Sequence, residues 1–186
     1  MFLLPDEMII KHCSPTLAGM KTANMFTYPF KNEVELRDTV RRLNRLLIGK
    51  GIRILPLRYQ NNCALIYLYR PSKLSKDLSH EIARTILTER GYSMQSPQCL
   101  LRDLMKRLNA SADFPHEIGL FLGYPPEDVW GFMKHQAQGY KCVGSWKVYG
   151  DEKQAQKTFE QYKKCTQLYT RWYTKGRSIE RLTVAV

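Results

Sequence analysis

The sequence predicts a single layered domain over residues 1–186, of the α/β or α+β class, with a small mixed sheet flanked by several amphipathic helices. Segments with apolar residues at helical spacing alternate with short runs rich in β-branched and aromatic residues, which favours such a layered mixture. A chain of 186 residues can bury a substantial core without metals or disulfides. No repeat and no Pro/Gly/Ser-rich linker marks a boundary, so we expect one domain with its sheet order open.

The clearest predicted helix runs from Asn32 to Leu47. Asn32 stands three residues before Glu35, which is a capping-box pattern, and glycines at 49 and 51 follow the helix. Its apolar side chains recur at helical spacing: Leu36, Val40, Leu43 and Leu47. The other face is basic and carries Arg37, Arg41, Arg42 and Arg45. We therefore expect an amphipathic helix.

A hairpin of two strands is predicted next, over residues 52–57 and 63–69. Both runs are rich in β-branched and aromatic residues, and the turn-forming sequence Gln60-Asn61-Asn62 separates them. The second run is almost entirely apolar from Ala64 to Leu68, which is typical of a strand in the middle of a sheet.

The remaining elements are predicted from local start and stop signals. We expect helices through Ile82–Leu87, from Ser96 to Leu108, after Pro125, and from Asp151 to near Gly176. Strands are predicted at 118–122 and 140–149, with an edge strand at 179–186.

Composition bounds the compartment and the partners. No apolar run is long enough to span a bilayer, and Met1–Glu7 lacks the basic start of a signal peptide. The five cysteines form no C-x-x-C pair, which favours free thiols in a reducing compartment, so we expect a cytoplasmic protein away from membranes. A formal charge of +12 attracts anions such as phosphorylated metabolites, nucleic acid or an acidic protein.

Two polar segments are not explained by periodicity: residues 12–24, HCSPTLAGMKTAN, and residues 114–129, FPHEIGLFLGYPPEDV. Together with GSWKVYGD at 144–151 and Cys165, they resemble a family of anaerobic bacterial proteins known only as a domain of unknown function. The resemblance spans nearly the whole chain and implies membership, without an activity, substrate or cofactor.

Cys13 is the most reactive residue type in the first segment. A thiol becomes nucleophilic when a nearby cation lowers its pKa, and His12 or Lys21 has the charge to do so. His116 is an equally suitable base once the chain folds, with Glu117 in an acid-base or orienting role. The alternative is a buried structural cysteine at a helix end.

Two further groups have the composition of ligand-binding sites. The stretch with Thr16, Lys21 and Asn24 combines hydroxyl, amide and ammonium groups suited to a small anion, although a helix turn that ends at Gly19 explains it equally well. Lys147 and Tyr149 share one face of the predicted strand at 140–149, where they are able to line a pocket.

A metal site is the weakest of these interpretations. His116-Glu117 resembles the start of a zinc-protease helix, but Leu120 stands where the second histidine is required. Cys13, His12, His116 and Glu117 are suitable ligand types without paired ligand spacing, so we assign no metal ligand and keep a metal or haem protein as an alternative.

The last predicted helix interleaves basic and aromatic residues, a composition that nucleic-acid binders use. Its aromatic residues recur at core spacing, however, which favours rings inside and lysines in solvent. These residues are Lys153, Lys157, Lys163, Lys164, Arg171 and Lys175, with Tyr162, Tyr169, Trp172 and Tyr173.

The leading hypothesis is therefore a protein that binds a small anionic ligand or cofactor in a pocket formed by the Cys13 and His116 segments, with Cys13 as a redox or nucleophilic thiol. The alternative is a non-catalytic basic adaptor that binds nucleic acid or an acidic protein, such as an electron-transfer protein. Catalytic activity, the cofactor and the oligomeric state stay open at this point.

Overall fold

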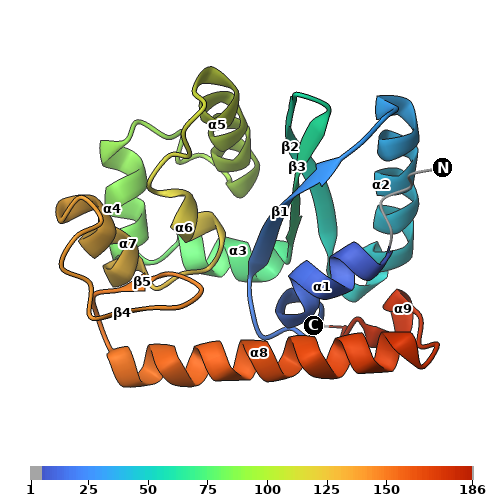
Figure 1. Cartoon of the computed structure of the whole chain (residues 1–186). Helices are drawn as coiled ribbons and strands as arrows, with labels where there is room; N and C mark the ends of the chain where they lie inside the picture. The colour runs from blue at the N-terminus through green and yellow to red at the C-terminus, as the bar shows by residue number, and fades with distance from the viewer. Residues whose placement is uncertain (1–5, 186) are drawn as a thin grey trace. The chain divides into compact units, whose positions relative to one another are not determined.

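The structure is a computed structural model that describes residues 6–185, so the expected lack of a signal peptide at the very start of the chain falls outside the described residues. It confirms the α+β class, since the chain combines helices with a small three-stranded sheet (Figure 1). The contacts divide the chain into two compact units. Unit 1 contains residues up to Ser72 and from Tyr162 onward, and unit 2 contains Lys73–Gln161. That the two units behave as one domain stays a prediction.

Unit 1 contains a three-stranded sheet in the order β1-β3-β2, formed by β1 (Ala23–Pro29), β2 (Arg53–Gln60) and β3 (Cys63–Tyr69). Both strand pairs are antiparallel, so the expectation of a mixed sheet is corrected for the described residues. The predicted hairpin is confirmed. Its turn places Asn61 and Asn62 at φ of 51° and 56°, the left-handed conformation that tight hairpins require. β3 is central and buried from Ala64 to Leu68, as its apolar sequence predicts.

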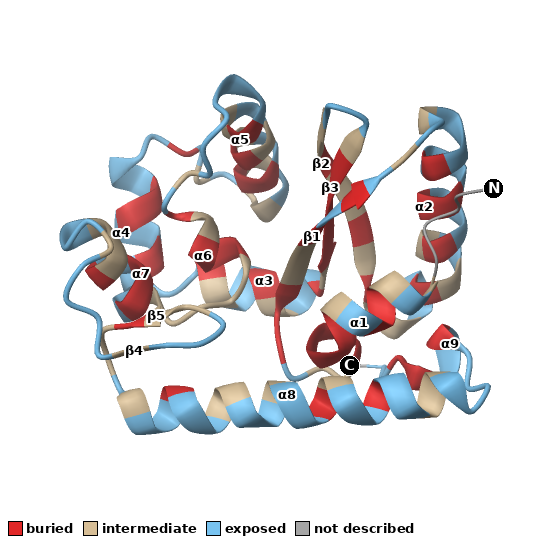
Figure 2. Ribbon diagram, in the orientation of Figure 1, coloured by how far each residue is buried: buried red, intermediate tan, exposed pale blue. Residues whose placement is uncertain are grey.

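Helices α1 (Asp6–Leu17), α2 (Glu33–Leu47) and α9 (Ile179–Leu182) also belong to unit 1, as does the C-terminal part of α8 (Glu152–Thr174). The cap of α2 is as predicted, because the Asn32 side chain accepts the N–H groups of Val34 and Glu35 at 2.9 and 3.5 Å. Buried positions of α2 form a stripe along the helix (Figure 2). They join residues of α1, the sheet and the chain's last helices in one hydrophobic core.

Unit 2 is mainly helical. It contains most of α3 (Pro71–Leu78) together with α4 (Glu81–Glu89), α5 (Pro97–Ala110), α6 (Ile118–Phe121) and α7 (Pro126–Lys134). A small hairpin of β4 (Cys142–Val143) and β5 (Lys147–Val148) follows. The predicted start of α5 is confirmed, because Ser96 Oγ accepts the N–H of Cys99 at 3.2 Å.

Three predicted strands are corrected. Residues 118–122 form the helical turn α6, because a short apolar run between loops does not distinguish a buried strand from a buried helix turn. The strand at 140–149 contracts to two-residue strands, since the N–H of Gly144 donates to the carbonyl of Trp146 and turns the chain. Ile179–Leu182 is a helical turn capped by Ser178 instead of an edge strand, and residue 186 lies outside the described residues.

Strand β1 is absent from the sequence-based prediction, because its first residues, Ala23 and Asn24, belong to the polar segment that periodicity does not explain. None of the helices in residues 6–185 is long and apolar enough to cross a membrane.

Candidate functional site

The sequence-predicted site residues fall in both compact units, and each unit is described separately. Unit 1 contains His12, Cys13, Thr16, Lys21 and Asn24, and unit 2 contains His116, Glu117, Lys147 and Tyr149.

Cys13 lies in the core of unit 1. Its exposed fraction is 0%, and burial raises the pKa of its thiol, an effect that nearby Lys21 offsets only in part. A nucleophilic cysteine needs solvent access and a lowered pKa. The position therefore matches the structural alternative, a buried cysteine on a helix, and gives the catalytic role no support.

The end of α1 uses its own polar groups. The N–H groups of Met20 and Lys21 both donate to the carbonyl of Pro15, and Gly19 donates to Thr16 with a φ of 75°. This is a Schellman helix end, which needs glycine at the left-handed position. The Thr16 hydroxyl donates to Asn24 Oδ1 at 2.7 Å. Backbone groups that an anion-binding loop would offer are thus already used, as the helix-turn alternative implies.

Lys21 and His12 are packed in the same part of unit 1. Lys21 is only 6% exposed, its Nζ lies 5.9 Å from the ring centre of Tyr162, and burial lowers its pKa to about 8. His12 stacks on Phe26 with ring centres 5.0 Å apart, and burial followed by the charge of Lys11 lowers its pKa. Both side chains are integrated into protein packing.

Arg70 is the main polar residue of unit 1 that sequence reasoning missed. It is 1% exposed and donates to four backbone carbonyls at 2.7–3.0 Å: those of Thr16, Leu17, Lys50 and Val184. Two of these carbonyls belong to the last turn of α1, where a cation is favoured. A signal was present, since a charged residue directly after an apolar central strand is unusual. Arg70 therefore links α1, the short 3₁₀ helix Ile48–Lys50 and the chain near Val184.

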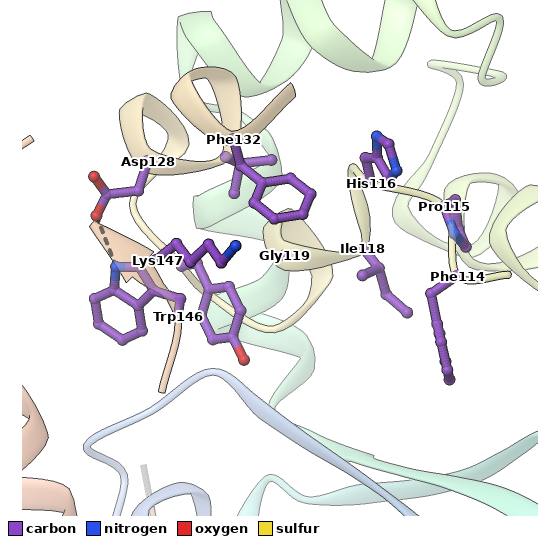
Figure 3. A pocket seen from close by; sticks show the side chains of 11 residues that line it. Phe114, Pro115, His116, Ile118, Gly119, Asp128, Phe132, Trp146 and Lys147 are labelled. Carbon is purple, nitrogen blue, oxygen red and sulfur yellow. Dashed lines mark hydrogen bonds between the residues drawn. The ribbon is translucent and has the colours of Figure 1, made fainter. Parts of the chain in front are cut away.

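Unit 2 contains a cavity of about 200 Å³, which we call the aromatic pocket (Figure 3). Most of its lining is aromatic or aliphatic, and the structure brings the predicted residues His116 and Lys147 together there. The lining residues are Phe114, Pro115, His116, Ile118, Gly119, Tyr124, Asp128, Val129, Phe132, Trp146 and Lys147. Such a combination of apolar walls and few polar groups is typical of small-molecule sites.

Lys147 supplies the positive charge of the aromatic pocket. Its Nζ donates to the carbonyl of Ala137 at 2.8 Å and lies 4.6 Å from the ring centre of Tyr140 and 5.9 Å from that of Phe132. His116 meets the same Phe132 ring edge-on, with ring centres 5.4 Å apart. The ammonium group is thus held in one place by a carbonyl and two rings.

Asp128 fixes one wall of the aromatic pocket, a role that sequence reasoning missed. Its Oδ2 accepts the indole N–H of Trp146 at 2.7 Å, and its Oδ1 accepts the backbone N–H groups of Tyr149 and Gly150, both at 2.7 Å. Trp146 in turn stacks on Tyr124 with ring centres 5.0 Å apart. From sequence alone, Asp128 is only an acid in the first turn of a helix, because its partners lie far along the chain.

Glu117 and Tyr149 lie in unit 2 but do not line the aromatic pocket. Glu117 is 3% exposed and accepts the hydroxyl of Tyr92 at 2.9 Å, and burial together with this carboxylate raises the pKa of Tyr92. Tyr149 packs on Gly131, where a side chain would collide with its ring, and stacks on His135. Its buried hydroxyl has no hydrogen-bond partner within the described residues.

Many residues on which the metal and basic-adaptor alternatives depend are engaged in other contacts. Nowhere in residues 6–185 are three His, Cys, Asp or Glu side chains grouped as metal ligands would be. On α2, three arginines form ion pairs with carboxylates: Arg37 with Glu33 at 2.6 Å, Arg41 with Asp38 at 3.0 Å, and Arg42 with Asp6 at 3.3 Å. On α8 the predicted aromatic residues are buried or half-buried and the basic residues are exposed. The lysines therefore do not alternate with exposed rings.

Comparison with known proteins gives one match. A family model described as a protein of unknown function (DUF3793) matches residues 9–183. Searches of curated proteins and of solved structures found no match.

Proposed function

The chain belongs to this family of unknown function, so its role has to be inferred from its own side chains, and we propose that it binds a small, planar, mainly apolar anion in the aromatic pocket of unit 2. The anaerobic bacterial origin and the cytoplasmic location expected from sequence remain predictions. The thiol chemistry expected of Cys13 is left out of the proposal, because the buried thiol has a raised pKa.

The observation that carries the proposal is the lining of the aromatic pocket. The rings of Phe114, Tyr124, Phe132 and Trp146 contribute to a cavity of about 200 Å³. Apolar cavities of about 150 Å³ hold benzene, so the volume suits a molecule of one or two rings. Flat aromatic walls favour a flat ligand, because stacked or edge-to-face rings gain energy beyond the area they bury.

Charge selects an anion among such ligands. Lys147 is the cation of the lining, and the carboxylate of Asp128 is already occupied by three N–H donors. The ammonium of Lys147 is therefore the group available to compensate a carboxylate or enolate on the ligand. His116, which also lines the pocket, adds a second polar group.

The pocket is also preorganised for binding. Asp128 holds Trp146 against Tyr124, and Ala137 with Tyr140 holds Lys147. Side chains fixed before binding lose little conformational freedom when the ligand arrives, which favours affinity.

Calorimetric titration with 1-naphthoate and its neutral analogue 1-naphthamide tests the proposal. We expect 1-naphthoate to bind more tightly than 1-naphthamide. Lys147→Met should lower the affinity for 1-naphthoate about tenfold, or about 1.4 kcal/mol, and leave the affinity for 1-naphthamide unchanged. Trp146→Ala should weaken both compounds because a wall of the pocket is lost.

Lys134→Met is the matched control, because Lys134 lies on α7, is exposed and does not line the aromatic pocket. It should leave both affinities unchanged. Absence of binding at millimolar concentration, or a Trp146→Ala variant that binds both compounds normally, would overturn the proposal.

A further inference from the structure

A second cavity in unit 2 adjoins the aromatic pocket. Its volume is about 380 Å³, and we call it the arginine cavity. Both cavities are lined by Phe114, Pro115 and His116, so this short segment is a wall common to them. The remaining residues of the arginine cavity are Arg90, Arg107, Ala110, Ser111, Asp113 and Glu117.

Neither arginine of the arginine cavity has an acidic partner within the described residues, and Arg107 is held by other contacts. The guanidinium of Arg107 lies 4.4 Å from the ring centre of Tyr92 and donates to the carbonyl of Arg90. Salt bridges within residues 6–185 involve neither Arg90 nor Arg107. A stacked guanidinium that points other N–H groups at a concave surface is suited to bind an oxyanion with two parallel hydrogen bonds.

Two acidic residues, Asp113 and Glu117, also line the arginine cavity. Glu117 is buried and accepts the Tyr92 hydroxyl, and neither it nor Asp113 forms an ion pair with Arg90 or Arg107 within 4.0 Å in the described residues. Glu117 thus acts through Tyr92, because it accepts the hydroxyl hydrogen bond of the ring on which Arg107 stacks.

We propose that the ligand has two parts, with its planar apolar anion in the aromatic pocket and a phosphate monoester group in the arginine cavity, where Arg90 and Arg107 bind it. The link between the two parts passes His116, which lines both cavities and offers an imidazole N–H to the linker or the phosphate. This assignment rests on the proposed function, because it extends the same site.

Calorimetric titration with 2-(1-naphthyl)ethyl phosphate and the corresponding alcohol tests this assignment. Both compounds keep the planar ring without its anionic group, so they differ only in the phosphate. We expect the phosphate ester to bind at least 30-fold more tightly than the alcohol, which lacks the group that the arginines would bind. Inorganic phosphate should compete with the ester and leave binding of the alcohol unchanged.

Arg90→Gln and Arg107→Gln should each lower the affinity for the phosphate ester about tenfold and leave the affinity for the alcohol unchanged. Arg102→Gln is the control, since Arg102 is exposed on α5 outside both cavities. If Arg107→Gln disturbs folding, Arg107→Lys keeps the charge but loses the guanidinium fork. It should then fold and still weaken the ester.

Equal affinity of the ester and the alcohol, with both weakened by Trp146→Ala, would overturn the two-part ligand and leave the aromatic-pocket proposal standing. If 3-(1-naphthyl)propanoate gains as much affinity over the alcohol as the phosphate ester does, the group bound in the arginine cavity is a carboxylate, and the phosphate assignment is wrong. If neither these compounds nor 1-naphthoate bind, the proposed function itself fails.

Discussion

The end of α1 in unit 1 and the aromatic pocket in unit 2 are both built from segments rich in reactive residue types, yet they use them in opposite ways. At the end of α1, the N–H groups of residues 19–21 and the Thr16 hydroxyl donate to other groups of unit 1, and Cys13 is fully buried. Around the aromatic pocket, one buried carboxylate fixes the wall, and an ammonium and several rings face a cavity. Residue type in a motif therefore indicates a site only when the folded chain leaves the side chains at the surface of a cavity.

The largest expected difference between buried and accessible reactive groups is in the rate of thiol modification. In native protein, N-ethylmaleimide should modify Cys13 roughly 1,000-fold more slowly than Cys99, because Cys13 reacts only after an opening of about 4 kcal/mol. Cys99 is half-buried and lies 3.4 Å from an Arg102 Nη2, so it serves as the internal reference. Time-resolved peptide mapping by mass spectrometry measures both rates. Equal rates would show that the end of α1 is open to solvent and that Cys13 is not protected by burial.

Arg70 tests whether unit 1 depends on its buried polar contacts. Arg70→Met should lower the free energy of unfolding by about 3 kcal/mol, since it leaves buried carbonyls without donors. Urea denaturation measures this change. Arg45→Met on the exposed face of α2 is the matched control and should change stability by less than about 0.5 kcal/mol. A similarly small change for Arg70→Met would contradict the inference that its four carbonyl contacts hold these segments of unit 1 together.

Lys21 gives a smaller, pH-dependent effect. Its pKa in the folded chain is about 8, below the usual value of 10.5, so between these values the unfolded chain holds more protons at Lys21. Stability contributed by this residue should therefore rise as the pH increases from about 8 to 10.5, by up to about 3 kcal/mol over the whole interval.

The measurement compares wild type with Lys21→Met by urea denaturation at several pH values, which subtracts the titration of other groups. The stability of wild type relative to the methionine variant should rise from pH 8 to pH 10.5. A constant difference would mean that Lys21 keeps an ordinary pKa. In that case the end of α1 would be more hydrated than its packing against Cys13 and Tyr162 indicates.

The sequence predicted those elements of the fold whose signals are local. The cap at Asn32, the Asn61-Asn62 turn and the Ser96 cap each depend on neighbours within a few residues. Short elements were wrong where local preference is ambiguous, as at Ile118–Phe121 and Ile179–Leu182. Strand β1 was missed because its pairing with β3 is a long-range contact.

The candidate site was predicted only in part for the same reason. His116 and Lys147 were selected by residue type, and both line the aromatic pocket. Arg70 and Asp128 were missed because their roles depend on distant partners. Arg70 binds the carbonyl of Val184, 114 positions away, and Asp128 binds the indole of Trp146, 18 positions away. Periodicity carries no information about such contacts.

The division of unit 1 into two chain segments has a consequence for synthesis on the ribosome. Its core includes Tyr169, Ile179 and Leu182, which emerge only after all of unit 2 has been made. At usual elongation rates that interval is on the order of ten seconds. During it, the apolar faces of α1 and β3 lack part of their cover, whereas unit 2 is contiguous and has its own residues available as soon as Gln161 has emerged. The nascent chain is therefore most vulnerable to aggregation at its beginning, and a slow passage through Lys73–Gln161 would lengthen that exposure.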